Sequence, residues 1–173
     1  MRLIDLWIDF VNLRDLTINS LFYNINASLV EDFTKRGIAD LKSGKIVTPL
    51  PPKATFLDDP LRVLQAIRFG ARFGFTLDEE LKKMAACDDV KAALAAKISR
   101  ERIGTEIDLM ISGNHLDKAM AYICDLTLFW IVFNLPHEFE PALPEECHRL
   151  CIACMDAAWN VIQLIGCFNF NDE

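Results

Sequence analysis

The sequence has no apolar segment long enough to cross a bilayer. One of its longest apolar runs is LTLFWIVFNL at 126–135. The length of this run is about half of the roughly 20 residues that a membrane helix needs. No apolar run with a cleavage site follows Met1, so we expect no secretory signal or other targeting segment. Without such a signal, the six cysteines indicate reduced thiols rather than a disulfide framework. These absences predict an intracellular protein with no membrane partner.

The chain as a whole also lacks the positive charge that is typical of nucleic-acid-binding proteins. Its formal net charge is −7. Residues 33–77 are the exception, because they carry eight basic and three acidic side chains. This segment could face an anionic partner, or its lysines could simply lie on solvated loops. With 52% apolar residues, the 173-residue chain can bury a core in one domain or two small ones.

Strand signals are few and lie before residue 51. Alternating polar and apolar residues predict a strand at 3–12, and we expect further strands at 30–33 and 45–50, the last stopped by Pro51-Pro52. Apolar residues at helical spacing favour a short helix at 15–26. A helical turn is expected at 37–43, ending at Gly44.

Helix signals dominate from residue 58 onward. Asp59 before Pro60 predicts a helix N-cap with proline at the first helical position, and this helix should stop near Gly74. Asp78 and Ser99 are expected to cap two further helices, the second of which ends at Gly113. We expect one or two helices at 116–133, a loop at 136–146 and a last amphipathic helix at 145–165. The predicted class is α+β, predominantly α.

The helix after Asp59 carries more charge than a core helix needs. At about 100° per residue, Val63, Ile67 and Ala71 share a face that should meet the core. A different face carries Gln65, Arg68 and Arg72.

Asp59 and Arg62 have two interpretations. They could form an i,i+3 ion pair worth a few tenths of a kcal/mol. Alternatively, they could read a base, because a carboxylate only accepts hydrogen bonds and a guanidinium only donates them. Side by side, the two groups match the donor and acceptor order on the pairing edges of cytosine and adenine. Guanine and uracil present the reverse order and would be refused.

Three cysteines near the C-terminus have the spacing C-x3-C-x2-C. Cys147, Cys151 and Cys154 could in principle hold a 4Fe–4S cluster, but only 19 residues follow them. A zinc site would need a distorted helix. The same spacing defines one helical face, which continues through Ala158, Val161 and Ile165. We favour this core stripe, since buried cysteines behave as small hydrophobic residues.

Several blocks of the sequence resemble the class II tRNA nucleotidyltransferases, the CCA-adding enzymes, most closely those of plants. The segments LRDLTINSLFYNI at 13–25 and VEDFTKRGIADLKSGKIVTPL at 30–50 are similar to the R-R-D-x-x-x-N and D…G-x-x-D-L blocks of the family. DDPLRVLQAIRFGARFGF at 58–75 resembles its E-D-x-x-R-x-x-R block, and SRERIGTEIDLM at 99–110 resembles the neck segment that follows. The similarity covers most of residues 1–135. The Asp–Arg pair alone does not separate CCA addition from poly(A) addition, but the wider blocks favour CCA addition.

The resemblance implies roles for nine residues, with CTP, ATP and tRNA as ligands. Asp59 and Arg62 match the residues that template the incoming base. The block that contacts ribose and triphosphate corresponds to Arg14, Asp15 and Asn19, and Arg68 lies in the nucleotide-reading helix. The middle block, linked to switching between the two nucleotides, corresponds to Asp32, Gly37 and Asp40. Plain structural roles remain open: Asp15 as a helix cap, Asn19 as a backbone partner and Gly37 as a turn.

The sequence departs from the family in its metal-binding motif. Relatives hold two Mg²⁺ ions with an Asp-x-Asp pair that follows a Gly-Gly stretch, and neither motif occurs here. Asp5 and Asp9 share a face of the first predicted strand, but they are about 13 Å apart at strand rise. We therefore expect no metal site.

Other differences indicate a truncated, internally deleted copy. The loop that precedes the R-R-D block in relatives is missing, so Asn12 leads directly into Leu13, which replaces the first arginine of that block. Asp58 replaces a glutamate, and Gln65 replaces the second arginine of the E-D-x-x-R-x-x-R block. The resemblance implies a partial nucleotidyltransferase head at 1–57, a helical neck with the nucleotide-reading region at 58–135 and a partial helical body and tail at 136–173.

We therefore expect nucleotide reading without stand-alone nucleotide addition. The alternative is a non-catalytic module that binds nucleotide or tRNA, or that associates with a complete family member. The resemblance does not decide the compartment: full-length relatives occur in the cytoplasm, the nucleus or an organelle.

Overall fold

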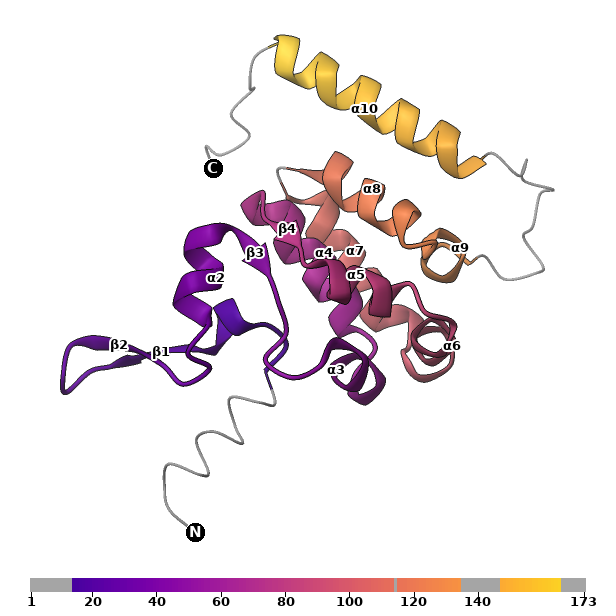
Figure 1. Cartoon of the computed structure of the whole chain (residues 1–173). Coiled ribbons are helices and arrows are strands. Elements are labelled where there is room, and N and C mark those ends of the chain that lie inside the picture. The colour runs from indigo at the N-terminus through magenta and orange to yellow at the C-terminus, as the bar shows by residue number, and fades with distance from the viewer. Residues whose placement is uncertain (1–13, 114, 135–146, 166–173) are drawn as a thin grey trace.

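The computed structural model describes residues 14–113, 115–134 and 147–165. Figure 1 shows a small strand-containing part beside a larger group of helices, which confirms the expected α+β, predominantly helical class. The strand predicted at 3–12 lies outside the described residues, as does the loop predicted at 136–146. The division into head, neck and body stays a prediction.

The first described elements differ from the helix predicted at 15–26. A single 3-10 turn, η1 (Thr17–Ser20), is followed by strand β1 (Leu21–Asn24). β1 forms an antiparallel hairpin with β2 (Leu29–Asp32), which confirms the second predicted strand. Helical spacing was misleading here, because Leu21 and Tyr23 gain cross-strand partners, Asp32 and Val30, that only the tertiary fold supplies.

The helical turn predicted after the hairpin is confirmed. Helix α2 (Gly37–Ser43) ends at Gly44, whose φ of 65° is the left-handed conformation that glycine adopts readily. Strand β3 (Lys45–Ile46) is shorter than the strand predicted at 45–50, and it pairs in parallel with β4 (Thr76–Leu77). The two strands lie against α4 (Arg62–Phe73).

The start of α4 corrects the predicted N-cap. Asp59 ends α3 (Pro52–Asp58), a helix that the sequence reading missed, and α4 begins at Arg62 after a turn. Asp59 still accepts a hydrogen bond from Leu61 N, 3.2 Å from Oδ1, so it stabilises that turn rather than the first turn of a helix starting at Pro60. Pro52 has a role beyond stopping the preceding strand: it begins α3, where its missing N–H costs nothing.

Two of the remaining helices begin at their predicted N-caps. Asp78 accepts a hydrogen bond from Glu80 N at the start of α5 (Glu79–Ala85), and Ser99 accepts one from Arg102 N at the start of α7 (Arg100–Ile111). Helix α6 (Asp88–Lys97) was missed, although two carboxylates in its first turn favour a helix start. Helices α8 (Leu116–Asp125), α9 (Phe129–Val132) and α10 (Cys147–Ile165) complete the described chain.

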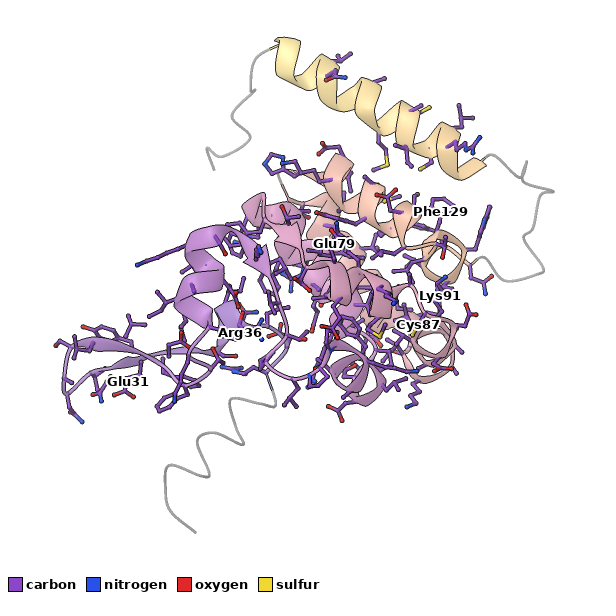
Figure 2. All side chains as sticks on the ribbon, in the orientation of Figure 1. Glu31, Arg36, Glu79, Cys87, Lys91 and Phe129 are labelled. Atoms are coloured by element: carbon purple, nitrogen blue, oxygen red, sulfur yellow. The ribbon has the colours of Figure 1, made fainter. Side chains whose placement is uncertain are left out.

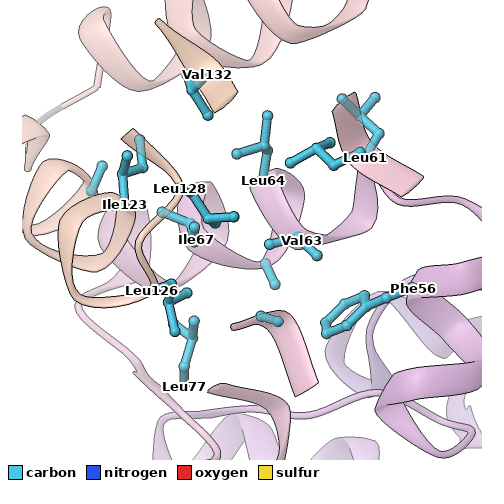
Figure 3. Close-up of a cluster of buried hydrophobic side chains, with 14 of the residues drawn as sticks. Phe56, Leu61, Val63, Leu64, Ile67, Leu77, Ile123, Leu126, Leu128 and Val132 are labelled. Atoms are coloured by element: carbon cyan, nitrogen blue, oxygen red, sulfur yellow. The ribbon is translucent and has the colours of Figure 1, made fainter. Parts of the chain in front are cut away.

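The core is built around α4. Its predicted inner face is confirmed, since Val63, Ile67 and Ala71 are at most 4% exposed. Figure 3 shows Val63 and Ile67 among side chains from several elements, including Phe56 of α3 and Ile123 of α8. Gly70 allows β4 to lie close to α4, because a Cβ at this position would lie 2.5 Å from Leu77 Cδ1. No helix of the described residues is long and apolar enough to cross a membrane.

The cysteine stripe predicted on α10 is only partly correct. Cys151 and Met155 contact the core, whereas Cys154, Ala158 and Val161 are exposed. Helix α10 therefore packs Cys151 and Met155 toward α8. The predicted stripe through Cys154, Ala158 and Val161 faces solvent. Among the side chains that the structure describes, no three His, Cys, Asp or Glu residues form a metal-binding group.

Candidate nucleotide-reading site

Asp59 lies in the turn between α3 and α4, where two groups fix its carboxylate. Oδ1 accepts from Leu61 N at 3.2 Å, and Oδ2 accepts from Arg102 Nη2 of α7 at 3.0 Å. The side chain remains 31% exposed. A carboxylate can accept about four hydrogen bonds, so these two contacts orient Asp59 and leave acceptor capacity for a ligand.

Arg62 is one turn further along the chain and is held from the α3 side. Its Nη1 lies 3.3 Å from Asp58 Oδ2 and 3.4 Å from the carbonyl oxygen of Thr55. The side chain is only 14% exposed. The i,i+3 ion pair considered for Asp59 and Arg62 is therefore wrong: Asp59 pairs with Arg102, and Arg62 pairs with Asp58. The site thus keeps an oriented acceptor and an oriented donor near the start of one helix.

The second polar face of α4 meets α7. Arg68 Nε donates to Glu106 Oε2 at 2.7 Å, and the two side chains are 13% and 8% exposed. Gln65 Nε2 is 3.4 Å from Glu106 Oε1, and the Arg68 guanidinium also stacks over the Phe69 ring at 4.2 Å. Arg72 is exposed at the other end of α4. These contacts make Arg68 and Glu106 a buried link between the two helices.

The proposed triphosphate block lies at the start of the described chain. Asp15 accepts hydrogen bonds from Asn19 Nδ2, at 3.2 Å to Oδ1 and 3.1 Å to Oδ2, and from Leu16 N at 2.9 Å. One interpretation made Asn19 a partner of the backbone. The structure shows that its side chain donates to the Asp15 carboxylate instead. Arg14 is exposed immediately before this group. Asp15 and Asn19 are brought together across the start of η1.

Asp32 of the middle block organises the turn that leads into α2. Its Oδ1 accepts from Thr34 Oγ1 at 2.6 Å, and its Oδ2 accepts from Ile38 N at 3.0 Å. Partial burial by itself would raise the pKa of this carboxyl. The hydrogen bonds from Thr34 and from backbone N–H groups at the start of α2 outweigh burial and lower the pKa below its ordinary value.

The other two middle-block residues join α2 to η1. Thr17 Oγ1 donates to Asp40 Oδ2 at 2.8 Å. Gly37 begins α2 and is not a turn residue. It is needed for a close approach, because a Cβ there would lie 2.6 Å from the carbonyl oxygen of Thr17. The middle block therefore contacts η1, which carries Asn19 and follows Asp15 in the chain.

Strand β3 and the residue after it connect this group to the α4 group. Thr17 N donates to Val47 O at 2.9 Å, and Ile46 is fully buried beside α4. The sequence reading did not single out Thr17, Arg102 or Glu106. Arg102 and Glu106 both lie in the neck segment 99–110. They are four residues apart in a predicted helix, so one face of that helix carries two charged side chains, and this was the available signal for them.

Comparison with known proteins shows which proteins the chain is similar to. The poly(A) polymerase head domain matches residues 6–47. The mitochondrial CCA tRNA nucleotidyltransferase of Saccharomyces cerevisiae is 55% identical over 100 residues, which are 58% of this chain and 18% of that protein. The tRNA nucleotidyltransferase cca2 of Schizosaccharomyces pombe is 40% identical over 133 residues, which are 76% of this chain and 28% of that protein. The chain therefore spans less than a third of the length of these relatives.

Solved structures show the same fold. A CCA-adding enzyme in complex with CTP superposes with a TM-score of 0.71 at 22% identity, over 95% of this chain and 37% of that one. The chain is thus similar to tRNA nucleotidyltransferases, and its expected resemblance to the CCA-adding enzymes is confirmed. The two relatives described above are fungal, so the closer likeness to plant enzymes stays a prediction.

Proposed function

We propose that this chain is the nucleotide-reading region of a CCA-adding tRNA nucleotidyltransferase and that it binds CTP and ATP in preference to GTP and UTP. Asp59 and Arg62 would read the base, and Arg14, Asp15 and Asn19 would contact the ribose and triphosphate. The proposal depends above all on one observation: Arg102 holds the Asp59 carboxylate and Asp58 holds the Arg62 guanidinium, so that both groups are oriented at the start of α4. The names of the relatives, which act on tRNA, give the substrate class.

The contacts in the site suggest a division of labour. Arg68 is engaged by Glu106, so we propose that it positions α4 against α7 and that its nucleotide contact is indirect. Asp32, Gly37 and Asp40 would act through η1, because Gly37 and Asp40 contact Thr17 directly. A change in the middle block would then be transmitted to Asp15 and Asn19, consistent with a role in nucleotide switching.

The Asp-x-Asp motif that the resemblance implies as the holder of two Mg²⁺ ions has no counterpart in this sequence. Asp5 and Asp9 lie outside the described residues. We therefore propose that the chain does not add nucleotides by itself. The test is to incubate the purified chain with labelled CTP or ATP, Mg²⁺ and a tRNA that lacks its 3′-terminal CCA. Extension of the tRNA would overturn this part of the proposal.

Nucleotide reading is tested by thermal unfolding with each of the four nucleoside triphosphates. A ligand that binds only the folded state raises the apparent stability by mass action. We expect CTP and ATP to raise Tm, with GTP and UTP having little effect, since a mismatched edge loses about 1–3 kcal/mol per bidentate contact. Equal shifts with all four nucleotides would contradict base reading.

Two variants make the test specific. Asp59→Ala and Arg62→Ala should each abolish the preference for CTP and ATP. Lys83→Ala is a matched control, because Lys83 is an exposed cation on α5. It should leave the nucleotide response unchanged.

A second candidate, association with a complete family enzyme, is favoured by the β1–β2 hairpin. Tyr23 and Val30 are cross-strand partners, and they are 63% and 53% exposed. Ile25 and Leu29 at the hairpin end are 80% and 63% exposed. Exposed apolar patches of this kind mark interaction surfaces. Sedimentation of the chain with a full-length relative should show a complex that Tyr23→Ser, Val30→Ser weakens, and independent sedimentation would exclude this candidate.

A further inference from the structure

The basic segment found in the sequence forms a surface around α2 that the nucleotide-reading residues do not use. Lys35 and Arg36 lie in the turn before α2, Lys42 lies in its last turn, and Lys45 follows in β3. All four side chains are exposed. We call these four residues the α2 basic surface. Arg36, labelled in Figure 2, lies where this surface meets the loop after β3.

Acidic groups do not neutralise the α2 basic surface from within its own segment. Asp40 is the one acidic residue between 33 and 57. It accepts a hydrogen bond from Thr17 on the side of α2 that faces η1. At about 100° per residue, Lys42 lies well away from that side. Lys53 belongs to the same stretch but is paired with Asp89 at 2.6 Å, so we do not include it in the surface.

The α2 basic surface lies near the proposed triphosphate block, because α2 contacts η1, which carries Asn19. β3, which carries Lys45, contacts α2 and also contacts α4 at Gly70, near the C-terminal end of that helix. On its other border is a pocket of about 270 Å³, lined by Arg36, by the loop of residues 47–52, and by Asp78 and Glu80 of the α5 start. The two carboxylates in this pocket would repel phosphate. The basic surface therefore has an acidic limit on the α5 side and continues toward α4.

We propose that the α2 basic surface binds the phosphate backbone of the tRNA whose 3′ end the reading site would serve. This inference rests on the proposed function for the identity of the RNA. A chain with net charge −7 repels RNA as a whole, so a surface whose four exposed basic side chains outnumber the neighbouring Asp32 and Asp40 determines which side an RNA can approach. Exposed lysines suit phosphate as mobile point charges, and such contacts supply affinity without reading sequence.

The test compares two variants of the complete chain with equal net charge. In the surface variant, Lys35, Lys42 and Lys45 are each changed to Gln. In the control variant, three exposed lysines of α5, α6 and α8, namely Lys83, Lys97 and Lys118, are each changed to Gln. Binding of a tRNA that lacks its terminal CCA is measured at several salt concentrations. The CTP response of each variant is measured by thermal shift.

We expect the surface variant to bind the tRNA roughly ten- to a hundredfold more weakly, with a salt slope shallower by about two to three units, one for each lost phosphate contact. An unrelated RNA duplex should lose affinity in parallel, because the contacts do not read sequence. The control variant should match the parent, and the CTP response should persist in both variants. If CTP does not raise the Tm of the parent chain, the proposed function is overturned. The comparison of RNA binding between the two variants would still decide whether the α2 basic surface binds phosphate.

Three results would overturn the inference. The first is equal weakening of tRNA binding in the surface and control variants, which would show a general charge effect. The second is no tRNA binding by the parent chain at low salt. The third is a concentration-dependent dimer that the surface variant abolishes, because the surface would then pair with an acidic face of a second copy.

Discussion

Arg102 Nη2 donates a hydrogen bond to Asp59 Oδ2 at 3.0 Å, joining residues 43 positions apart in the chain. Through this contact, Arg102 of α7 holds the Asp59 carboxylate, which we propose reads the base. Because Arg102 and Asp59 side chains are 50% and 31% exposed, the pair is solvated and contributes little to stability, about 0–1 kcal/mol. Its main consequence is the orientation of Asp59.

We therefore expect Arg102→Gln to separate orientation from stability. Without nucleotide, Tm should stay within a few degrees of the parent value, whereas the rise in Tm with CTP and ATP should shrink markedly. Arg102→Lys keeps the charge and should restore part of the response. Thermal unfolding with and without nucleotide checks this, and a full CTP response in Arg102→Gln would show that Asp59 needs no positioning partner.

The buried pair of Arg68 and Glu106 should behave differently. Removing one partner leaves an uncompensated charge in a site where the side chains are 13% and 8% exposed. We expect Glu106→Ala to lower the free energy of unfolding by about 3–5 kcal/mol, as measured by urea denaturation. Asp89→Ala is the control, because its pair with Lys53 is exposed, and its unfolding midpoint should hardly change. Similar midpoints for the two variants would contradict the role of Arg68 as a link between α4 and α7.

Two glycines in helices make a matched pair. Gly37→Ala should destabilise the fold by about 1–3 kcal/mol, because the new Cβ would overlap the Thr17 carbonyl oxygen. Gly104→Ala has no neighbour within 4 Å and lies inside α7, so it should stabilise the fold by about 0.5–1 kcal/mol. Urea denaturation of both variants checks the opposite signs, and a Gly37→Ala variant that is not destabilised would show that α2 does not need its close contact with η1.

Asp32 predicts a dependence of stability on acid pH. Its folded pKa lies below the ordinary value of 3.8, so its contribution is fully present above that value and is lost as pH falls through the folded pKa. We expect Asp32→Asn to cost about 1 kcal/mol at pH 7 and less as the pH approaches the folded pKa. Denaturation at both ends of this range measures the difference, and a cost independent of pH would mean that the carboxylate charge contributes nothing.

The thiols of Cys124 on α8 and Cys154 on α10 should differ in reactivity. Burial raises the pKa of the Cys124 thiol, and the nearby Cys151 thiol raises it further. Cys154 is exposed on α10. Because the thiolate is the reactive form, iodoacetamide at neutral pH should label Cys154 before Cys124. Peptide mass spectrometry gives the order, and preferential labelling of Cys124 would contradict the packing of α10 on α8.

Part of this fold was predictable because its signals are local. Asp78 and Ser99 bond N–H groups two or three residues ahead, and Gly74 needs only its own backbone freedom to end α4. The missed elements show the limit. Leu21–Asn24 is a strand because β2 pairs with it, and Pro52 begins a helix that packs against α5 and α6.

The site divides in the same way. The sequence by itself determined which residue types stand at Asp59 and Arg62, their separation of three residues and the family blocks that contain them. Only the tertiary structure decided that Asp59 pairs with Arg102 rather than with Arg62, and that Glu106 is buried against Arg68. The physical reason is that spacing determines neighbours within one helix, whereas partners about 40 residues apart depend on how α4 and α7 pack together.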